Sequence, residues 1–296
     1  MIRKTALGIV VFILVVFLGA GWYFSSQIIH PAKGPCDKKH FIYCGTPEDM
    51  GLKYEDVSFT ASDGVSLKGW YIPGNRKEAV IMVHGHGADR HEGLRWVRVL
   101  NRFGMSVLLF DLRNHGTSGG DVTTMGFFEK RDVSGAAAWL KAIKKIEQIG
   151  VFGVSMGASS SILAMAEDKN IKAGVFEAGF SSLRKELNDI ASRDFGLPSV
   201  PLINIVSLLF RLRTGVSLDA VAPEKAIAKI SPRSLFVIHC PGDDYIHFSH
   251  GKRIFESAGQ PKDFWASPCT THAEAWQGDP DVAERRVALF FSKNLR

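Results

Sequence analysis

The chain of 296 residues is 46% hydrophobic and 22% charged, which excludes a disordered or fibrous protein and is enough for one sizeable core. Its net charge of +6 is spread along the sequence, and the densest helical group, Lys141, Lys144 and Lys145, has the spacing of a solvated helix face. We therefore expect one large domain and no nucleic-acid partner.

The N-terminal segment is more apolar than the rest of the chain. Residues 6–24 carry no charge, follow two basic residues and end near a Trp-Tyr pair, as expected at a membrane interface. A helix of this length rises about 28 Å, enough to cross the hydrocarbon core. We predict a single-pass transmembrane anchor within residues 1–28 and a linker over residues 29–53. A cleaved signal peptide is the alternative, because residues 19–21 are small enough for a signal peptidase.

Four cysteines can form two pairs. Cys36 and Cys44 enclose a short loop after the apolar segment, whereas Cys240 and Cys269 each follow a predicted strand. Both pairings are sterically plausible, and four reduced cysteines are the alternative. Basic residues flank the apolar segment on both sides and leave its orientation open. Because disulfides persist in oxidising compartments, their formation would place the body of the protein outside the cytoplasm, which is the location that we favour.

From Tyr54 onward, short β-branched runs alternate with helical stretches. Residues 56–74 read as a hairpin that turns at Asp63-Gly64. Several later strands are continuous apolar runs, which is typical of a parallel sheet covered by helices on both faces. We predict a doubly wound α/β domain over residues 54–296. Its further strands are expected at residues 79–85, 105–111, 148–155, 171–179, 234–240 and 263–267, with helices over 94–104, 129–145, 156–168 and the C-terminal segment.

Between residues 181 and 231 the strand pattern is interrupted by helical runs, including the apolar stretch over residues 201–215. An insertion at this point of a parallel sheet would lie over the carboxyl ends of the strands, where ligands bind. We predict a small helical lid over residues 181–231. The alternative is an amphipathic helix packed on the main core.

The motif "GVSMG", residues 153–157, lies between a predicted strand and a predicted helix. In G-x-S-x-G the chain turns sharply, so the serine is strained and exposed, and the glycines allow close approach of neighbouring segments. The start of the helix also directs free N–H groups at the site. We therefore predict Ser155 as a nucleophile.

Together with "VHGHGADR", "LLFDLRNHGTSGG", "SLFVIHCPGDDYI" and "THAEAW", this motif resembles the alpha/beta hydrolase superfamily from about Tyr54 to the C-terminus. More narrowly, the chain is similar to small membrane-anchored hydrolases related to serine aminopeptidases and acyl esterases. The resemblance implies the alpha/beta hydrolase fold and a serine-hydrolase mechanism. It also implies that an acid and a base follow the serine in the order Ser, Asp, His.

The acid is expected in the loop after the strand over residues 234–240. By similarity to the family's pattern in this loop, the acid falls on Asp243, with Asp244 as the alternative. Two residues depart from that pattern, since Cys240 replaces a glycine and His247 replaces a proline.

The base is expected after the last strand and before the C-terminal helix. Among the ten histidines, His272 occupies that position. The others lie near the apolar segment, at strand ends or in loops that precede the last strand. A histidine accepts the proton of the serine hydroxyl, and a carboxylate holds the imidazole in the required tautomer.

Two backbone N–H groups are expected to stabilise the oxyanion that forms when the serine attacks a carbonyl group. One belongs to Met156, the residue after the serine. By resemblance to the family's His-Gly loops, the other belongs to His86, whose side chain is incidental to this role.

The stretch "HGHGADRH", residues 84–91, has the composition of a metal site, but its acidic and histidine spacing differs from that of metallo-hydrolases and no further ligand set is evident. Its glycine spacing also differs from that of a dinucleotide fingerprint. We expect neither a metal nor a cofactor.

We therefore expect a membrane-anchored serine hydrolase that cleaves an ester or thioester of a small-molecule or lipid-like substrate through an acyl-enzyme. The apolar stretch in the predicted lid and the predicted anchor favour acyl esters. A serine peptidase related to the aminopeptidases is the alternative within this class. A non-catalytic binding protein on a hydrolase scaffold is the alternative from another class. The sequence gives no indication of oligomeric state.

Overall fold

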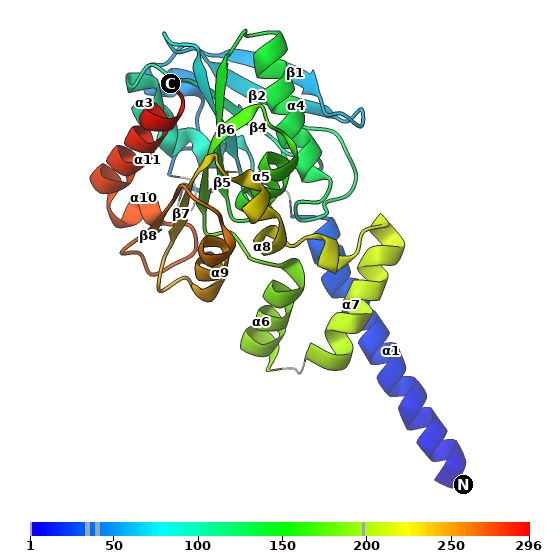
Figure 1. Cartoon of the computed structure of the whole chain (residues 1–296). Coiled ribbons are helices and arrows are strands. Elements are labelled where there is room, and N and C mark those ends of the chain that lie inside the picture. Colours follow the sequence, from blue (N-terminus) through cyan, green and yellow to red (C-terminus); the bar gives the residue numbers. More distant parts are fainter. Residues whose placement is uncertain (1, 33–35, 39–41, 197–198) are drawn as a thin grey trace.

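A computed structural model describes residues 2–32, 36–38, 42–196 and 199–296. Its centre is an eight-stranded sheet in the order β1-β2-β4-β3-β5-β6-β7-β8 (Figure 1). β2 pairs antiparallel with β1 and β4, and the other neighbours are parallel. The strands are β1 (Glu55–Thr60), β2 (Ser66–Ile72), β3 (Glu78–Val83), β4 (Ser106–Phe110), β5 (Gln148–Val154), β6 (Ile171–Glu177), β7 (Ser234–His239) and β8 (Lys262–Ala266).

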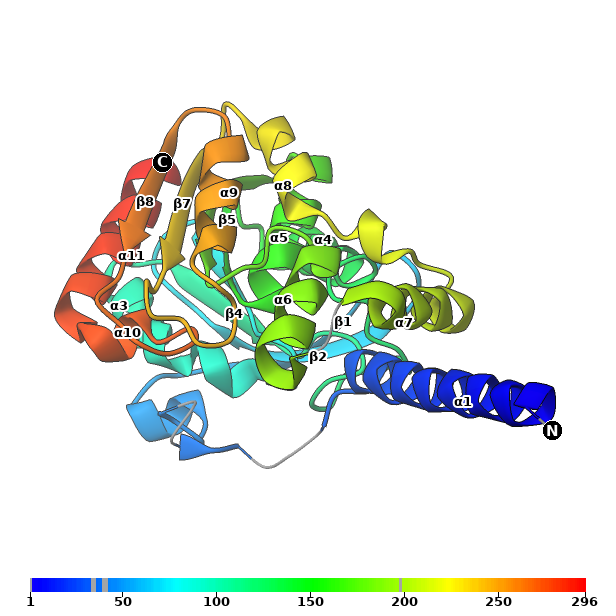
Figure 2. The ribbon, with the colours of Figure 1, turned by 90° about the horizontal axis from the view of Figure 1, so that it is seen from below.

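Helices cover both faces of this sheet, as the continuous apolar strands predict (Figure 2). One face packs against α4 (Glu129–Ala142), α5 (Met156–Glu167) and α9 (Ser249–Ser257), and the other against α3 (Leu94–Arg102) and α11 (Pro280–Asn294). The predicted hairpin is present as β1 and β2, with Gly64 in the turn at a φ of 90°. The doubly wound α/β fold is thereby confirmed.

A helical insertion connects β6 to β7. It consists of α6 (Leu183–Phe195), α7 (Ser199–Thr214), the 3-10 helices η3 (Leu218–Ala220) and η4 (Ile227–Ile230), and α8 (Pro223–Ala226). Figure 1 shows α6 and α7 beyond the end of the sheet, with α7 beside α1 (Ile2–Ile29). The predicted lid range includes residues 197–198, and the predicted linker includes residues 33–35 and 39–41, all of which lie outside the described residues.

The N-terminal apolar segment forms most of α1. Across the part of the chain that the structure describes, no helix combines the length and apolarity needed to cross a membrane, so the predicted transmembrane role of residues 6–24 is without support.

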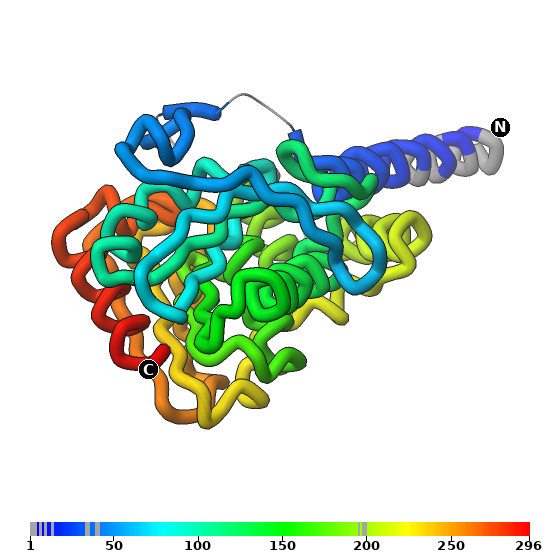
Figure 3. The backbone as a smooth tube through the Cα atoms, turned by 90° about the horizontal axis from the view of Figure 1, so that it is seen from above, coloured from blue at the N-terminus to red at the C-terminus, as the bar shows by residue number. Residues whose placement is uncertain are grey.

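The C-terminal end of α1 packs on the body of the molecule. Ile28 and Ile29 are buried in a third core cluster together with apolar residues of α6 and α7. The Ile29 carbonyl accepts hydrogen bonds from Asn114 Nδ2 and the Thr123 N–H, both at 2.9 Å. α1 extends away from the sheet, and the C-terminal end of the chain lies on the opposite side of the molecule (Figure 3). Residues of the predicted anchor and of the predicted linker therefore contribute to the core of the fold.

Both plausible cysteine pairings are present as disulfides, Cys36–Cys44 and Cys240–Cys269. The first closes a short loop after α1. The second joins the segment after β7 to the segment after β8.

Candidate active site

Ser155 lies at the junction between β5 and α5. Its φ of 54° is in the left-handed region, where a non-glycine residue is strained by about 1–3 kcal/mol. A Cβ atom on Gly153 would overlap the Gly157 carbonyl group, and one on Gly157 would overlap the carbonyl of Val83 in β3. The Ser155 N–H donates to the Glu177 carbonyl at 2.8 Å. The two glycines therefore allow the sharp turn to pack directly against the neighbouring strands.

The structure brings Ser155, His272 and Asp243 together. His272 Nε2 lies 3.0 Å from Ser155 Oγ, and His272 Nδ1 lies 2.9 and 3.1 Å from the two carboxylate oxygens of Asp243. Because a carboxylate only accepts hydrogen bonds, it fixes the imidazole proton on Nδ1. Nε2 is then free to accept the proton of the serine hydroxyl, as a general base must.

The loop after β7 distinguishes the two candidate acids. Asp243 is buried, and its Oδ1 accepts the N–H groups of Tyr245 and Ile246 at 2.9 and 2.8 Å, whereas Asp244 is exposed. Burial acts to raise the pKa of Asp243, but the hydrogen bond from His272 and the electrostatic interactions with His272 and His239 outweigh burial and hold the pKa below its ordinary value. Asp243 is therefore ionised and oriented toward His272.

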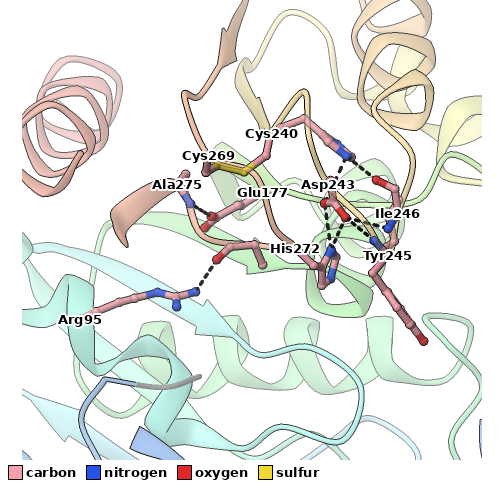
Figure 4. Close-up of a disulfide and its surroundings, with 11 residues drawn as sticks. Arg95, Glu177, Cys240, Asp243, Tyr245, Ile246, Cys269, His272 and Ala275 are labelled. Atoms are coloured by element: carbon pink, nitrogen blue, oxygen red, sulfur yellow. Dashed lines mark hydrogen bonds and ion pairs between the residues drawn. A yellow bond between two sulfur atoms is a disulfide. The ribbon is translucent and has the colours of Figure 1, made fainter. Parts of the chain in front are cut away.

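The Cys240–Cys269 disulfide joins the two loops that carry the acid and the base (Figure 4). Cys240 precedes Asp243 by three residues, and Cys269 precedes His272 by three residues. The disulfide therefore links the two loops covalently close to the hydrogen bond between Asp243 and His272.

Two buried polar side chains, Glu177 and Arg95, contact the backbone just after His272, and the sequence did not indicate either of them. Glu177 Oε1 accepts the N–H of Ala275 at 3.0 Å, and Arg95 Nη2 donates to the Ala273 carbonyl at 3.3 Å (Figure 4). Burial raises the pKa of Glu177 to about 7, with Arg95 acting in the opposite direction. A charged residue at the end of the apolar run over residues 171–177 is the signal that could have identified Glu177.

The loop after β3 approaches the serine closely. A Cβ atom on Gly85 would lie 3.2 Å from the Ser155 Cβ, and Glu92 Oε2 accepts the Gly85 N–H at 2.7 Å. His86, the next residue, lines the same cavity as Ser155. Met156 is the first residue of α5, where an N–H group has no intrahelical acceptor. Both residues predicted to supply oxyanion donors therefore lie beside the serine.

The side chain of His86 has a contact that the sequence did not indicate. His86 Nε2 lies 3.0 Å from the Ile28 carbonyl and donates to it, which connects the loop after β3 to the end of α1. Burial lowers the pKa of His86, so its ring is neutral near pH 7.

The other histidines of "HGHGADRH" have protein partners. His84 Nε2 accepts the Leu112 N–H at 2.9 Å, and His91 Nδ1 lies 2.7 Å from Asp89 Oδ1. Among the residues that the structure describes, no group of three or more His, Cys, Asp or Glu side chains could hold a metal ion.

Ser155 opens into a cavity of about 180 Å³. The residues with polar side chains in its wall are Ser155, His86 and Tyr245 on the side of the sheet loops, and Gln27 and Glu186 on the side of the helices. The rest of its wall is apolar. Loops contribute Met125, Phe180 and Ile246, and three helices contribute the larger part: Phe24 and Ile28 of α1, Leu183, Leu187, Ile190 and Ala191 of α6, and Leu202, Ile203 and Val206 of α7. Such a cavity suits an apolar group attached to a reactive carbonyl.

Comparisons with known proteins agree with this geometry. The family described as the alpha/beta hydrolase fold matches residues 78–202. YqkD of Bacillus subtilis, an uncharacterized protein, is 31% identical over 251 residues, which are 82% of each chain. The esterase Pf2001 of Pyrococcus furiosus is 26% identical with a TM-score of 0.73, covering 90% of this chain and 100% of that one. The thiohydrolase aneE of Aspergillus aculeatus is 34% identical over 133 residues, 43% of this chain and 42% of its own.

The resemblance noted from the sequence is thus confirmed at the level of the superfamily. The esterase and thiohydrolase similarities support a hydrolase. On the sequence match to YqkD, the eight-stranded sheet and the family match, the chain belongs to the alpha/beta hydrolase superfamily.

Proposed function

We propose that the protein is a serine hydrolase that cleaves esters or thioesters of small apolar acids. The observation that carries this proposal is the continuous hydrogen-bonded chain from Ser155 through His272 to Asp243, with Ser155 in the wall of a mainly apolar cavity. An ionised carboxylate, an oriented imidazole and a strained serine are the groups that acyl transfer requires.

In the first half of the reaction, Ser155 Oγ attacks the carbonyl carbon while His272 Nε2 takes the hydroxyl proton. The negative charge that develops on the carbonyl oxygen is stabilised by the backbone N–H groups of His86 and Met156. The tetrahedral intermediate then collapses. The bond to the leaving alcohol or thiol breaks, and His272 returns the proton to the leaving group.

In the second half, a water molecule attacks the acyl-enzyme. His272 removes one proton from the water, and the second tetrahedral intermediate releases the carboxylic acid as that proton passes to Ser155 Oγ. Asp243 keeps the imidazole in the same orientation and stabilises its positive charge in both halves. The sum of the two halves consumes one water and regenerates the free serine.

Ester and thioester cleavage is favoured over other acyl transfers by two observations. The cavity wall is mainly apolar, so it suits the hydrocarbon part of an acyl group. In addition, an esterase and a thiohydrolase are among the proteins similar to this chain.

A fluorophosphonate probe tests the proposal because it reacts with an activated serine. We expect labelling of Ser155, and loss of both labelling and ester hydrolysis in Ser155→Ala. Ser161→Ala is the matched control: Ser161 lies in α5, is fully buried, and its Oγ has no hydrogen-bond partner among the described residues. Absence of labelling in the folded protein, or full hydrolysis by Ser155→Ala, would contradict the proposal.

We propose also that this domain folds in an oxidising compartment, because both cysteine pairs lie within bonding geometry and disulfides persist outside the reducing cytoplasm. We expect that, when the protein from its native source is alkylated without reduction and analysed by mass spectrometry, none of the four cysteines is alkylated, because all four are in disulfides. Free thiols at both pairs would overturn this location.

A further inference from the structure

Glu186 is a buried carboxyl group in the wall of the cavity that contains Ser155. It lies in the first turn of α6 and is 3% exposed. Neither of its carboxyl oxygens has a hydrogen-bond partner among the described residues. It is also the only carboxylate among the described residues that line this cavity. A buried polar group without a partner is destabilising, so its place beside an otherwise apolar cavity calls for an explanation.

The nearest basic side chain, His250, does not neutralise Glu186. His250 Nδ1 accepts the Ser181 N–H at 3.0 Å, so the proton of the neutral ring is on Nε2. Nε2 lies 3.0 Å from Asp189 Oδ2 but 3.4 Å from Glu186 Oε2, and therefore donates to Asp189. Burial lowers the pKa of His250, which keeps the ring uncharged near pH 7.

The nearby guanidinium group is also engaged elsewhere. Arg193 donates two hydrogen bonds to Asp194, at 2.6 and 2.8 Å, and a third to the Tyr245 carbonyl. Around Glu186 the negative charges of Asp189, Asp194 and Asp243 thus outnumber the single positive charge of Arg193.

The result is a negative electrostatic potential at the Glu186 carboxyl group. Burial first, and then Asp189 and the other carboxylates against the opposing charge of Arg193, raise the pKa of Glu186 to about 8. Near neutral pH and without a bound amine, the carboxyl group therefore holds a proton. An ammonium group that entered the cavity could replace that proton and would supply the missing hydrogen-bond donors and the missing counter-charge.

We propose that Glu186 is a specificity-determining residue that binds a protonated amine of the substrate, so that the preferred substrates are esters of amino acids. This inference rests on the proposed function, because the amine is bound while the acyl carbonyl lies at Ser155. It makes the proposed substrate class more specific, because the acyl part of the ester would carry an ammonium group on an otherwise apolar chain.

Paired ethyl esters test this inference. Each pair contains an ammonium ester and a neutral ester of the same shape: ethyl alaninate with ethyl isobutyrate, and ethyl 6-aminohexanoate with ethyl heptanoate. Acid release is followed by chromatography. We expect the wild-type protein to prefer the ammonium member in at least one pair by about tenfold in kcat/KM, as for a charge-assisted hydrogen bond in a desolvated site.

Two variants separate a role of Glu186 from a general effect of charge. Glu186→Gln should abolish the preference. Asp194→Asn removes one negative charge from the same helix but lies outside the cavity, and should keep the preference. Equal rates within both pairs, or a preference that survives in Glu186→Gln, would overturn the inference while Ser155-dependent hydrolysis of the neutral esters upheld the proposed function. Absence of Ser155-dependent hydrolysis of every ester would instead overturn the proposed function, and the inference with it.

Discussion

One wall of the cavity comes from loops at the ends of the sheet strands, and the opposite wall comes from α1, α6 and α7. The sheet wall is held by directional contacts: Ser155 donates to the Glu177 carbonyl, Asp243 accepts two backbone N–H groups, and the Cys240–Cys269 disulfide joins the acid and base loops. For the acyl transfer that we propose, such directional contacts would keep the reacting groups in place.

The helical wall is held mainly by apolar packing. Its buried apolar residues belong to the third core cluster. Its polar contacts are fewer and include Ile28 with His86 at the cavity and Arg213 with Ser25 and Ser26, at 2.9 and 2.8 Å, away from it. Apolar contacts are not directional, so the shape of this wall can change while the packing persists. The comparison indicates that the sheet wall sets the chemistry and the helical wall sets the choice of substrate.

The largest effect is expected from the acid of the sheet wall. Asp243→Asn should lower kcat by about 10⁴-fold, because an amide no longer holds the His272 proton on Nδ1. The adjacent, exposed Asp244 is the matched control, and Asp244→Asn should leave kcat near the wild-type value. Steady-state hydrolysis of an ethyl ester measures both. Equal losses in the two variants would show that the acid had been assigned to the wrong carboxylate.

The disulfide in the sheet wall should have the next largest effect. In the double variant Cys240→Ser/Cys269→Ser, the loops of Asp243 and His272 lose their covalent link, and we expect kcat to fall about ten- to a hundredfold with little change in KM. Removing the Cys36–Cys44 disulfide in the same way is the control, since this pair lies in the loop after α1 and should leave kcat unaltered. Similar losses from both pairs would mean that the disulfides act through general stability.

The sequence predicted the sheet wall far better than the helical wall, and the reason is physical. Ser155 is defined by a local turn whose glycines are required by close backbone contacts, and Asp243 and His272 follow strands that the apolar pattern makes visible. The choice between Asp243 and Asp244 needed the structure, because adjacent carboxylates differ only in the direction of their side chains.

The helical wall depends on packing between segments far apart in the chain. Nothing local in the sequence indicates that Ile28 and Phe24 line the same cavity as Ser155, and the apolar pattern of residues 6–24 predicts a membrane anchor or a cleaved signal peptide instead. Glu186 lies in a polar helical stretch where a solvated face is the natural expectation, and its burial follows only from how α6 is placed over the cavity. Glu177 and Arg95 likewise become partners of the His272 loop only through tertiary structure.

A substitution in the helical wall should change the choice of substrate but not the chemistry. Ala191 is buried in α6 and lines the cavity, so Ala191→Phe should fill space that a longer acyl chain occupies. We expect kcat/KM for ethyl octanoate to fall about tenfold relative to ethyl acetate. Leu208→Phe on the exposed face of α7 is the control and should leave this ratio unchanged. A parallel loss for both esters in Ala191→Phe would place Ala191 in the support of the catalytic groups instead.

The smallest effect is expected in the pH dependence of stability, which tests whether the helical wall holds a protonated carboxyl group. The pKa of Glu186 rises from 4.5 to about 8 on folding. The folded state therefore favours the protonated form, and the stability that this contributes is fully present below about pH 4.5 and is lost as the pH rises to about 8. Glu186→Gln is neutral at every pH, so its melting temperature should rise by a few degrees relative to wild type between about pH 6 and pH 8.5.

Asp194→Asn gives the opposite sign and so serves as the control for that measurement. The hydrogen bond from Arg193 holds the pKa of Asp194 below its ordinary value, so the stability that this carboxylate contributes is lost only as the pH falls into the acidic range. Between about pH 6 and pH 8.5, the difference between Asp194→Asn and wild type should therefore stay constant. If the difference for Glu186→Gln were also constant, Glu186 would be ionised throughout this range. The helical wall would then present a fixed negative charge to the cavity, and an amine would have no proton to replace.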